Sequence, residues 1–418
     1  MKKLQPIRGT RDVYGQEMLE QSYIIQKSSN IMESYGYNEI STPVFEESGV
    51  FYRTLGDTSD IVTKETYTFN DRDKTSITLR PELTAGMVRA MISNGMTQTL
   101  PQKFYAIGPV FRHERPQDCR YRQFTQIDCE YFGAKSPYTD VETILMASKI
   151  INDLGMKKYV TLELNSLGDK ESRAAYTEAL TEFLKKYEKD LSEESKVRLS
   201  KNPLRILDSK NETDRNLLIN APKIDQFYNQ QSREYWEAVL SGLDEVGAQY
   251  VINQKLVRGM DYYCHTVFEF TTSKLGSQGT VLAGGRFDGL SEMMGGPRIE
   301  AIGFAAGLER LSKLRQSIGV DNAEKPFLYM ISVGDFSVEC IKISNILRDS
   351  GFIIHQDFGN NLSKSMRKAS NLGASACLLL GPDELANNSI KVKNMTSGSE
   401  EIVAISNLTR VISDIIAK

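Results

Sequence analysis

The chain has 418 residues, of which 40% are hydrophobic and 25% charged, and its formal net charge at pH 7 is -3. These proportions are typical of a globular protein, and the length predicts two or three domains. A charge so close to zero argues against a surface for non-specific binding of polyanions. No run of about 18 apolar residues occurs, and the start, MKKLQPIRG, lacks the apolar segment of a signal peptide. We therefore expect a cytosolic protein.

Cysteine and histidine are too scattered to predict a metal centre or a catalytic triad. None of the cysteines forms a CxxC pair, which argues against a disulfide framework and against a zinc site. They are Cys119, Cys129, Cys264, Cys340 and Cys377. The three histidines lie far apart in the sequence, so a triad would have to assemble from isolated residues. We expect reduced thiols and a chemistry without a histidine base.

The N-terminal part mixes helical and extended patterns. A helix is expected at Gln16–Ser34, and an extended segment broken by a proline at Tyr37–Phe45. Asp60–Leu79 alternates polar with β-branched or aromatic residues around a turn, as a hairpin does. Pro81 then opens a helical run, Glu82–Asn94, where proline fits the first turn. Because helices and strands do not alternate strictly, the pattern favours an α+β fold with an antiparallel sheet over a doubly wound parallel one.

A short basic stretch stands out in this near-neutral chain. From Phe111 to Gln126 the sequence reads FRHERPQDCRYRQFTQ and contains Arg112, Arg115, Arg120 and Arg122. Local basicity without global basicity indicates a site for one particular anion, and we expect that ligand to carry phosphate.

The flanks of this stretch read as two strands, Tyr105–Phe111 and Tyr121–Phe132, around a polar loop. A two-residue period places Arg122, Gln126 and Glu130 on one face of the second strand. That face would carry a cation, an amide and a carboxylate. A hairpin with a solvated charged face fits the same pattern equally well.

Two later stretches also carry candidate chemistry. From Leu256, LVRGMDYYCHTVFEF brings Arg258, Tyr262 and Tyr263 ahead of an expected strand, although an arginine at a strand end is more often a surface residue. The glycine-rich stretch that starts at Val281 contains neither a GxGxxG fingerprint nor a GxxxxGK[ST] loop, so any nucleotide site is neither of the Rossmann nor of the P-loop type. It ends in a helix, Gly307–Leu314, entered directly from a strand.

Composition divides the rest of the chain. The charged segment Asp169–Ser200 has the periodicity of amphipathic helices, and a solvated excursion fits it as well as a substrate-contacting module. Gln316–Lys325 reads as a linker to a small α/β domain that begins at Pro326. The strands expected in that domain are Phe327–Val333, Ile353–His355, Ala376–Leu380, Ile390–Val392 and Ile402–Ala404, and the helices are Val338–Ser350, Leu362–Leu372 and Leu408–Ala417.

Four segments resemble the histidyl-tRNA synthetases, a family of the class IIa subgroup of class II aminoacyl-tRNA synthetases. They are TLRPELTAG from Thr78, FRHERPQDCRYRQFTQIDCE from Phe111, LVRGMDYYCHTVFE from Leu256, and GGRFDGL with AIGFAAGLERL from Gly284 onward. The resemblance covers essentially the whole chain, and LVRGMDYY is its most specific part. It implies a catalytic domain at 1–325 with a helical insertion at about 169–225, and an anticodon-binding domain at 326–418.

The resemblance implies a reaction in which histidine and ATP form an adenylate and tRNA then receives the histidine. Arg112 would hold the α-phosphate and Arg310 the γ-phosphate, with Arg120 also in the ATP site and Phe124 stacked on adenine. Arg258 would lie near the histidine carboxylate and the α-phosphate, and with Arg112 it would be catalytic. Magnesium would be carried by the ATP phosphates, with the metal-binding residues left unknown, and no organic prosthetic group is expected.

The same resemblance implies a histidine site made of polar side chains. Glu82, Thr84 and Gln126 would bind the amino end of the substrate. Glu130 and Tyr263 would hydrogen-bond the two imidazole nitrogens. The remaining residues assigned to histidine are Tyr262 and Arg258.

Contacts to tRNA and a second subunit are further implications. The residues expected to contact tRNA are Arg115, Gln117 and Arg122 near the basic loop, and Asn360, Lys364 and Arg367 in the C-terminal domain. The segment Tyr37–Glu46 resembles the first class II motif, which forms a homodimer interface in the family.

The sequence departs from the commonest bacterial pattern at Thr125, Asp128, Cys264 and His265, and these residues have no assigned role. Two other functions are considered. One is a catalytically inactive relative such as the regulatory subunit of ATP phosphoribosyltransferase, which should lose the motif arginines and the C-terminal domain. The other is a plain RNA-binding or scaffold protein, in which the intact motif residues would have no explanation.

Overall fold

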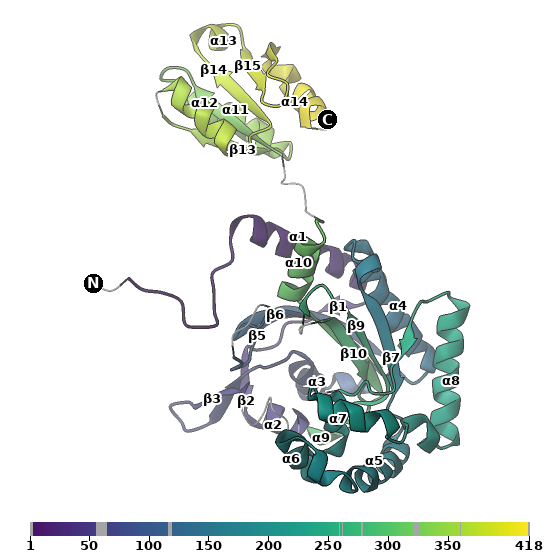
Figure 1. Cartoon of the computed structure of the whole chain (residues 1–418). Coiled ribbons are helices and arrows are strands. Elements are labelled where there is room, and N and C mark those ends of the chain that lie inside the picture. Colours follow the sequence, from purple (N-terminus) through teal and green to yellow (C-terminus); the bar gives the residue numbers. More distant parts are fainter. Residues whose placement is uncertain are drawn as a thin grey trace. The chain divides into compact units, whose positions relative to one another are not determined.

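The computed structural model divides into two compact units, Met1–Asn322 and Ala323–Lys418, each described here by itself (Figure 1). The residues that the structure describes are 3–55, 65–115, 119–258, 260, 262–276, 279–320, 326–359 and 361–416. Within these ranges, no helix combines the length and the apolar character needed to cross a membrane.

The first unit is built on an eight-stranded sheet with the order β1-β5-β6-β11-β10-β9-β7-β8. Its strands are β1 (Asn38–Glu39), β5 (Gln102–Phe111), β6 (Gln123–Phe132), β7 (Thr161–Ser166), β8 (Val251–Ile252), β9 (Cys264–Thr271), β10 (Thr280–Arg286) and β11 (Ala301–Gly307). All neighbours pair antiparallel except the two short edge strands β1 and β8. The sheet confirms the α+β prediction, and the β5–β6 hairpin confirms the strands expected on either side of the basic loop.

Helices cover one face of this sheet and leave the other face to the site. The covering helices are α1 (Gly15–Ser34), α4 (Pro137–Asp153), α8 (Gln230–Glu245) and α10 (Leu308–Ser317). α4 packs on β11 and α10 on β6. Ile127 and Cys129 of β6 are buried in the hydrophobic core. Ser136 caps α4 by accepting from the Tyr138 N–H, and Pro137 occupies its first turn, where its missing N–H costs nothing.

A second, three-stranded sheet lies near α2 (Gly49–Leu55). Its order is β2-β4-β3, with β2 at Phe45–Glu47, β3 at Tyr67–Asn70 and β4 at Ser76–Leu79. The β3–β4 pair is the expected hairpin, as far as it falls within the described residues. The following helix, α3, spans Thr84–Ser93, so the prediction that Pro81 and Glu82 belong to its first turn is wrong. The Pro81 carbonyl instead accepts from Arg112 Nε at 2.9 Å, which holds this segment against the basic loop.

The charged segment after Asp169 is helical, as expected. It contains α5 (Lys170–Lys185), α6 (Glu193–Lys201) and α7 (Glu212–Leu217). Asp169, Ser192 and Asn211 cap the three helices, each accepting from a backbone N–H of the first turn. The leucines on the inner faces of α5 and α6 are buried and belong to the hydrophobic core of the first unit. A further short helix, α9 (Leu290–Met293), follows β10.

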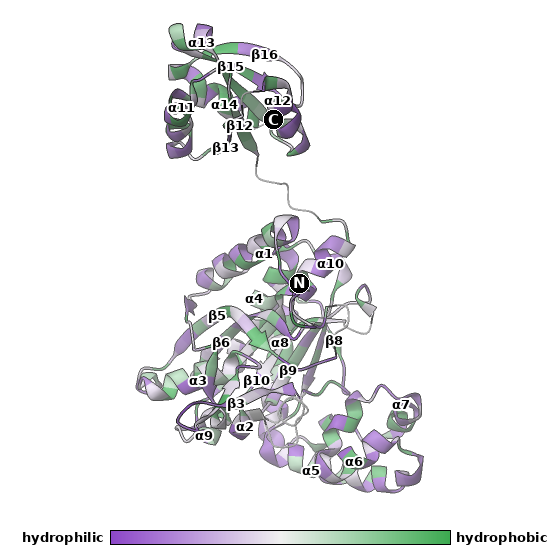
Figure 2. Ribbon diagram, turned by 90° about the vertical axis from the view of Figure 1, so that its left-hand side faces the viewer, coloured by the Kyte–Doolittle hydropathy of each residue, from purple (hydrophilic) through white to green (hydrophobic). Residues whose placement is uncertain are grey.

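The second unit is a small α/β domain with a five-stranded sheet of order β13-β12-β14-β15-β16. Its strands are β12 (Phe327–Ser332), β13 (Ile353–Asp357), β14 (Ala376–Leu380), β15 (Ser389–Asn394) and β16 (Glu400–Ala404), and its helices are α11 (Ser337–Asp349), α12 (Leu362–Asn371), α13 (Pro382–Ala386) and α14 (Leu408–Ile416). Figure 2 shows the apolar strands inside and polar residues on the helices. Within the described residues, each strand and helix predicted for this domain is present, whereas α13 and a 3-10 turn at Ile405–Asn407 were not predicted. The expected linker begins inside α10, which ends at Ser317.

Candidate active site

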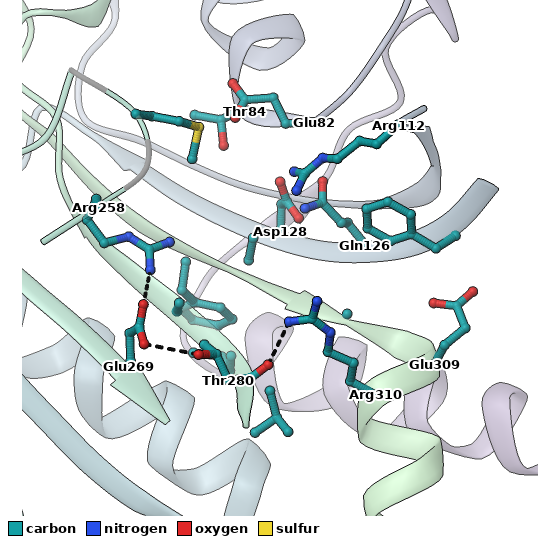
Figure 3. Close-up of a pocket in the computed structure, with 18 of the residues that line it drawn as sticks. Glu82, Thr84, Arg112, Gln126, Asp128, Arg258, Glu269, Thr280, Glu309 and Arg310 are labelled. Carbon is teal, nitrogen blue, oxygen red and sulfur yellow. Dashed lines mark hydrogen bonds and ion pairs between the residues drawn. The ribbon is translucent and has the colours of Figure 1, made fainter. Parts of the chain in front are cut away.

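A cavity of about 390 Å³ lies on the face of the large sheet that the helices leave uncovered (Figure 3). Strands β6, β10 and β11 supply its floor, the segment before α3 supplies one wall, and the segment before β9 supplies another. Three sequence stretches that lie far apart in the chain therefore meet at one site.

One face of β6 supplies four side chains to the cavity. Phe124, Gln126, Asp128 and Glu130 all line it, as a two-residue period requires. The prediction for Gln126 and Glu130 is confirmed. The prediction for Arg122 is wrong, because Arg122 precedes the strand and its Nε donates to the Glu114 carbonyl at 3.4 Å outside the cavity lining.

Backbone carbonyls fix two of the cavity's arginines. Besides its bond to Pro81, Arg112 places its guanidinium 5.3 Å from the centroid of the Phe124 ring. Arg310, in the first turn of α10, donates from Nη1 to the Thr280 carbonyl at 2.9 Å. These contacts orient the two guanidinium groups. Arg120 is held differently, by an ion pair of 2.5 Å with Glu114.

Arg258 is largely enclosed, with 14% of its side chain exposed. Its Nη1 pairs with Glu269 Oε1 at 2.6 Å, and Glu269 Oε2 accepts from Thr280 Oγ1 at 3.1 Å (Figure 3). Its guanidinium lies 5.2 Å from the centroid of the Tyr263 ring. Burial by itself would lower the pKa of Arg258, but Tyr263 and Glu269 raise it above its ordinary value. The group therefore stays charged inside the protein.

Three buried carboxyl groups, Glu82, Asp128 and Glu130, line the same cavity and are 3%, 0% and 2% exposed. Burial raises the pKa of Glu82 to about 7. It raises the pKa values of Asp128 and Glu130 well above their ordinary range, and the charge on a neighbouring carboxylate adds to the effect. Such a cluster is poised to receive a cationic or hydrogen-bond-donating ligand.

The hydrogen bonds inside this cluster are incomplete. Tyr262 donates to Glu82 Oε2 at 3.1 Å, and Thr84 donates to Glu130 Oε1 at 2.6 Å. Five other buried oxygens of this cluster have no hydrogen-bond partner among the described side chains. They are Glu82 Oε1, Gln126 Oε1, Glu130 Oε2 and both carboxylate oxygens of Asp128. Buried acceptors are normally satisfied, so these atoms indicate where ligand donors belong.

The glycine-rich stretch allows β11 to lie close to β6 at the cavity. A Cβ added at Gly303 of β11 would lie 1.7 Å from Glu130 Oε2 and 2.2 Å from the Cys129 carbonyl oxygen. Only glycine leaves room here for the Glu130 side chain between β6 and β11. The glycine thus shapes the pocket rather than forming a phosphate loop.

Sequence comparison decides the family. The pattern described as Histidyl-tRNA synthetase matches residues 9–311, and the Anticodon binding domain pattern matches residues 327–415. The chain belongs to the histidyl-tRNA synthetase family. Its relatives include proteins named Histidine--tRNA ligase from Gluconobacter oxydans, 48% identical over 99% of both chains, and from Rickettsia bellii, 45% identical over 97% of both.

Solved structures agree with this family. The apo histidyl-tRNA synthetase of S. aureus superposes with a TM-score of 0.82 at 34% identity and covers 98% of this chain and 99% of its own. An ATP phosphoribosyltransferase regulatory subunit/histidyl-tRNA synthetase from Bacillus halodurans shares the fold alone, with a TM-score of 0.67, 20% identity and coverage of 91% of this chain and 100% of its own.

The structure brings most of the family's expected site residues to one cavity. Those that line it are Arg112, Arg120, Phe124, Arg310, Glu82, Thr84, Gln126, Glu130, Arg258, Tyr262 and Tyr263. Arg115 is exposed beside the basic loop, and Lys364 and Arg367 are exposed on α12 of the second unit. Gln117 and Asn360 lie outside the described residues.

Several acidic residues of the cavity were not anticipated from the synthetase resemblance. They are Glu114, Asp128, Glu269 and Glu309. The period of β6 could have revealed Asp128, since it lies between two residues assigned to that face. Glu309 could not be found this way, because its carboxylate accepts from the Thr125 N–H, 184 positions away in sequence, at 3.0 and 3.1 Å.

The remaining departures, Cys264 and His265, lie outside the cavity lining. Cys264 begins β9, and His265 has a positive φ of 44°. Burial lowers the pKa of His265 to about 4, which keeps its ring neutral at physiological pH. The ring packs 4.9 Å from that of Tyr235, so its surroundings are those of a structural residue.

Proposed function

We propose that the chain is a histidine--tRNA ligase that activates L-histidine with ATP and transfers it to the 3′ end of tRNA(His). The observation that carries the proposal is the meeting of fixed arginines and unsatisfied buried carboxyl groups in one cavity. Family membership over the whole chain supports the same reaction. The substrates are ATP, histidine and tRNA.

The arginine side of the cavity is assigned to ATP. Arg112 contacts the α-phosphate, Arg310 the γ-phosphate, and Phe124 stacks on adenine, with Arg120 also on this side. The histidine carboxylate attacks the α-phosphorus, and the bond to the leaving pyrophosphate breaks. Charge builds on the phosphate oxygens in the transition state, so preorganised cations are the strongest means of stabilising it. Arg258 is assigned a place between the histidine carboxylate and that phosphate.

Magnesium enters this scheme with the nucleotide. Among the described residues, no three His, Cys, Asp or Glu side chains are grouped to hold a metal ion. Mg²⁺ would therefore be carried mainly by the phosphate oxygens of ATP, as is usual for this cation. The chain's own contribution at the phosphates is its arginines.

The carboxylate side is assigned to histidine. Glu82, Thr84 and Gln126 bind its amino end, with Tyr262 holding Glu82 in place. Glu130 and Tyr263 bind the two imidazole nitrogens. An isostere that leaves a buried carboxylate or phenol unpaired is rejected strongly, because the desolvation cost of that group is not recovered.

Transfer requires tRNA, and the exposed cations are assigned to it. Arg115 is exposed and Arg122 is partly buried, both near the basic loop. Lys364 and Arg367 lie on the first turns of α12, near its N-cap Asn361. The second unit belongs to the anticodon-binding family, which supports its contact with the anticodon. A cytosolic location stays a prediction from the sequence.

A homodimer is also proposed, through the segment Tyr37–Glu46. Val44 and Phe45 are exposed in the single chain, at 37% and 56%, as residues of a subunit interface would be. Sedimentation equilibrium at micromolar concentration should give twice the 47.1 kDa of one chain. A monomer alone would refute this assembly without touching the proposed reaction.

A regulatory, catalytically inactive relative is the alternative. It is disfavoured because Arg112, Arg258 and Arg310 all face the cavity and the C-terminal domain is present. The test is charging of tRNA(His) transcripts with radiolabelled histidine by the full-length chain. We expect acid-precipitable label that depends on ATP. No charging of a tRNA from the same source would contradict the proposal.

A further inference from the structure

Of the three buried carboxyl groups Glu82, Asp128 and Glu130, only Asp128 has no role in the proposed reaction. It lies in the middle of the site face of β6, between Gln126 and Glu130, and is fully buried (Figure 3). Neither of its oxygens has a side-chain hydrogen-bond partner among the described residues, and the Leu83 N–H is a backbone donor that acts on its charge. A buried carboxylate without a partner destabilises the free protein, so its presence calls for an explanation in the bound state.

A structural ion pair does not explain why Asp128 is buried in the cavity. Arg112 and Arg80 are the cations that act most on the charge of Asp128, yet neither forms an ion pair with it within the described chain. Arg80 instead donates to the carbonyls of Pro109 and Thr42, both at 2.8 Å. Both guanidinium groups are therefore positioned by backbone oxygens, and neither depends on Asp128 for its orientation.

The unsatisfied acceptors at the amino end of the proposed histidine site suit a ligand that brings several N–H donors. An ammonium has three such donors. Glu82 and Gln126 each keep one unpartnered buried oxygen there, and Asp128 keeps two. A further such oxygen, Glu130 Oε2, remains for an imidazole N–H. The carboxyl groups are not grouped as metal ligands, so an organic cation fits them better than a metal ion.

We propose that Asp128 is a specificity-determining residue, whose carboxylate accepts a hydrogen bond from the α-ammonium group of the amino acid. This inference rests on the proposed function and adds a ligand-binding residue to it. A deamino analogue of histidine lacks all three N–H donors of the ammonium group. When such an analogue binds, Asp128 remains desolvated and has no ligand donor to pair with. The site then rejects a deamino analogue strongly, and Asp128 carries part of that rejection.

The test compares two ligands on the full-length chain without ATP. Isothermal titration calorimetry gives the Kd for L-histidine and for 3-(imidazol-4-yl)propionate, which lacks only the amino group. Asp128→Asn keeps the shape and removes the charge, so we expect histidine binding to weaken ten- to a hundredfold, as for one charge-assisted hydrogen bond of about 1.5–3 kcal/mol. Binding of the propionate should change less than twofold. Glu309→Gln, in the same cavity, is the matched control and should leave both Kd values unchanged.

Thermal unfolding of the free protein separates ligand binding from a structural role. Asp128→Asn should leave the Tm unchanged or raise it, because it removes an unpartnered buried acid. A lower Tm with equal weakening of both ligands would overturn the proposal, and so would an unchanged Kd for histidine. If Asp128→Asn does not fold, Asp128→Gly allows the same comparison of the Kd values for histidine and the propionate. Failure of the wild-type chain to bind histidine would instead contradict the proposed function itself.

Discussion

Arg258 shows how one side chain can be both buried and charged. Glu269 and Tyr263 hold it. The proposed reaction assigns Arg258 a place between the two substrates, which makes it the strongest candidate for stabilising the transition state. Arg258→Ala should fold and lose about 10²- to 10³-fold in the rate of histidine-dependent pyrophosphate exchange. This corresponds to roughly 3 to 4 kcal/mol for one preorganised charge.

The control for that variant is Arg198→Ala, which removes an arginine paired with Glu194 on α6, away from the cavity. Its exchange rate should stay within twofold of wild type. Circular dichroism of both variants establishes that they are folded. Exchange by Arg258→Ala within about threefold of wild type would rule out the role assigned to this arginine.

Glu82 predicts the pH dependence of histidine binding. Burial raises its pKa to about 7, so the free site holds a proton below that pH and a carboxylate above it. Only the carboxylate form accepts from the ammonium group without first losing a proton. The Kd for histidine should therefore rise about tenfold as the pH falls from 8 to 6, because the competent fraction falls by that factor.

The imidazole of free histidine titrates in the same range, near pH 6.5. Glu82→Gln separates the two effects, since it removes the protein group and leaves the ligand unchanged. Calorimetric titrations of both proteins across pH 6 to 8 measure the difference. An identical pH profile in the variant would show that Glu82 does not control binding.

At the scale of elements, the close packing of β6 against β11 sets the shape of the pocket that the proposed function assigns to histidine. Gly303→Ala places a Cβ against Glu130 and the Cys129 carbonyl, and the backbone oxygen cannot move aside cheaply. We expect the free energy of unfolding to fall by roughly 1–3 kcal/mol, which lowers the Tm, and we expect histidine binding to be lost. Gly289→Ala is the control, because a Cβ there meets nothing within 4 Å and its φ of -95° suits alanine. Equal effects of the two substitutions would refute this packing role.

Elements with strong local patterns could be predicted from the sequence. The β5–β6 hairpin follows from alternation, and the C-terminal α/β unit follows from short apolar strands separated by amphipathic helices. The start of α3 could not be predicted, because Pro81 is held by Arg112, which follows β5, and does not enter the helix. Tertiary contacts decided this boundary against the local preference.

The candidate site was predictable to the extent that it lies on one strand. Period two gave Gln126 and Glu130, whereas Arg122 precedes β6 and turns to the Glu114 carbonyl. The pairing of Arg258 with Glu269 depends on how the segment before β9 folds back over the sheet. Such non-local contacts leave no periodic signal in the sequence, and only the family resemblance anticipated the place of Arg258.

At the scale of the whole molecule, the two units should divide the two steps of the reaction. Every residue assigned to ATP or histidine lies in Met1–Asn322, which has its own hydrophobic core. A chain ending at Asn322 should keep pyrophosphate exchange and lose most tRNA charging, because a distant second contact raises the effective concentration of the first.

Both assays should be run on the same truncated protein, with circular dichroism to establish its folding. The full-length chain is the matched control. Normal charging by a folded truncated protein would mean that the second unit is not needed to bind tRNA. Equal loss of exchange and charging would mean that activation is not confined to the first unit.

The central claim is that this cavity joins histidine to AMP. Exchange of labelled pyrophosphate into ATP by the full-length chain, with each of the twenty amino acids supplied singly, tests it without any tRNA. The account predicts exchange with histidine and at most background exchange with the other nineteen, because only imidazole satisfies both Glu130 and Tyr263. Exchange driven equally well by another amino acid, or no exchange with histidine, would contradict it.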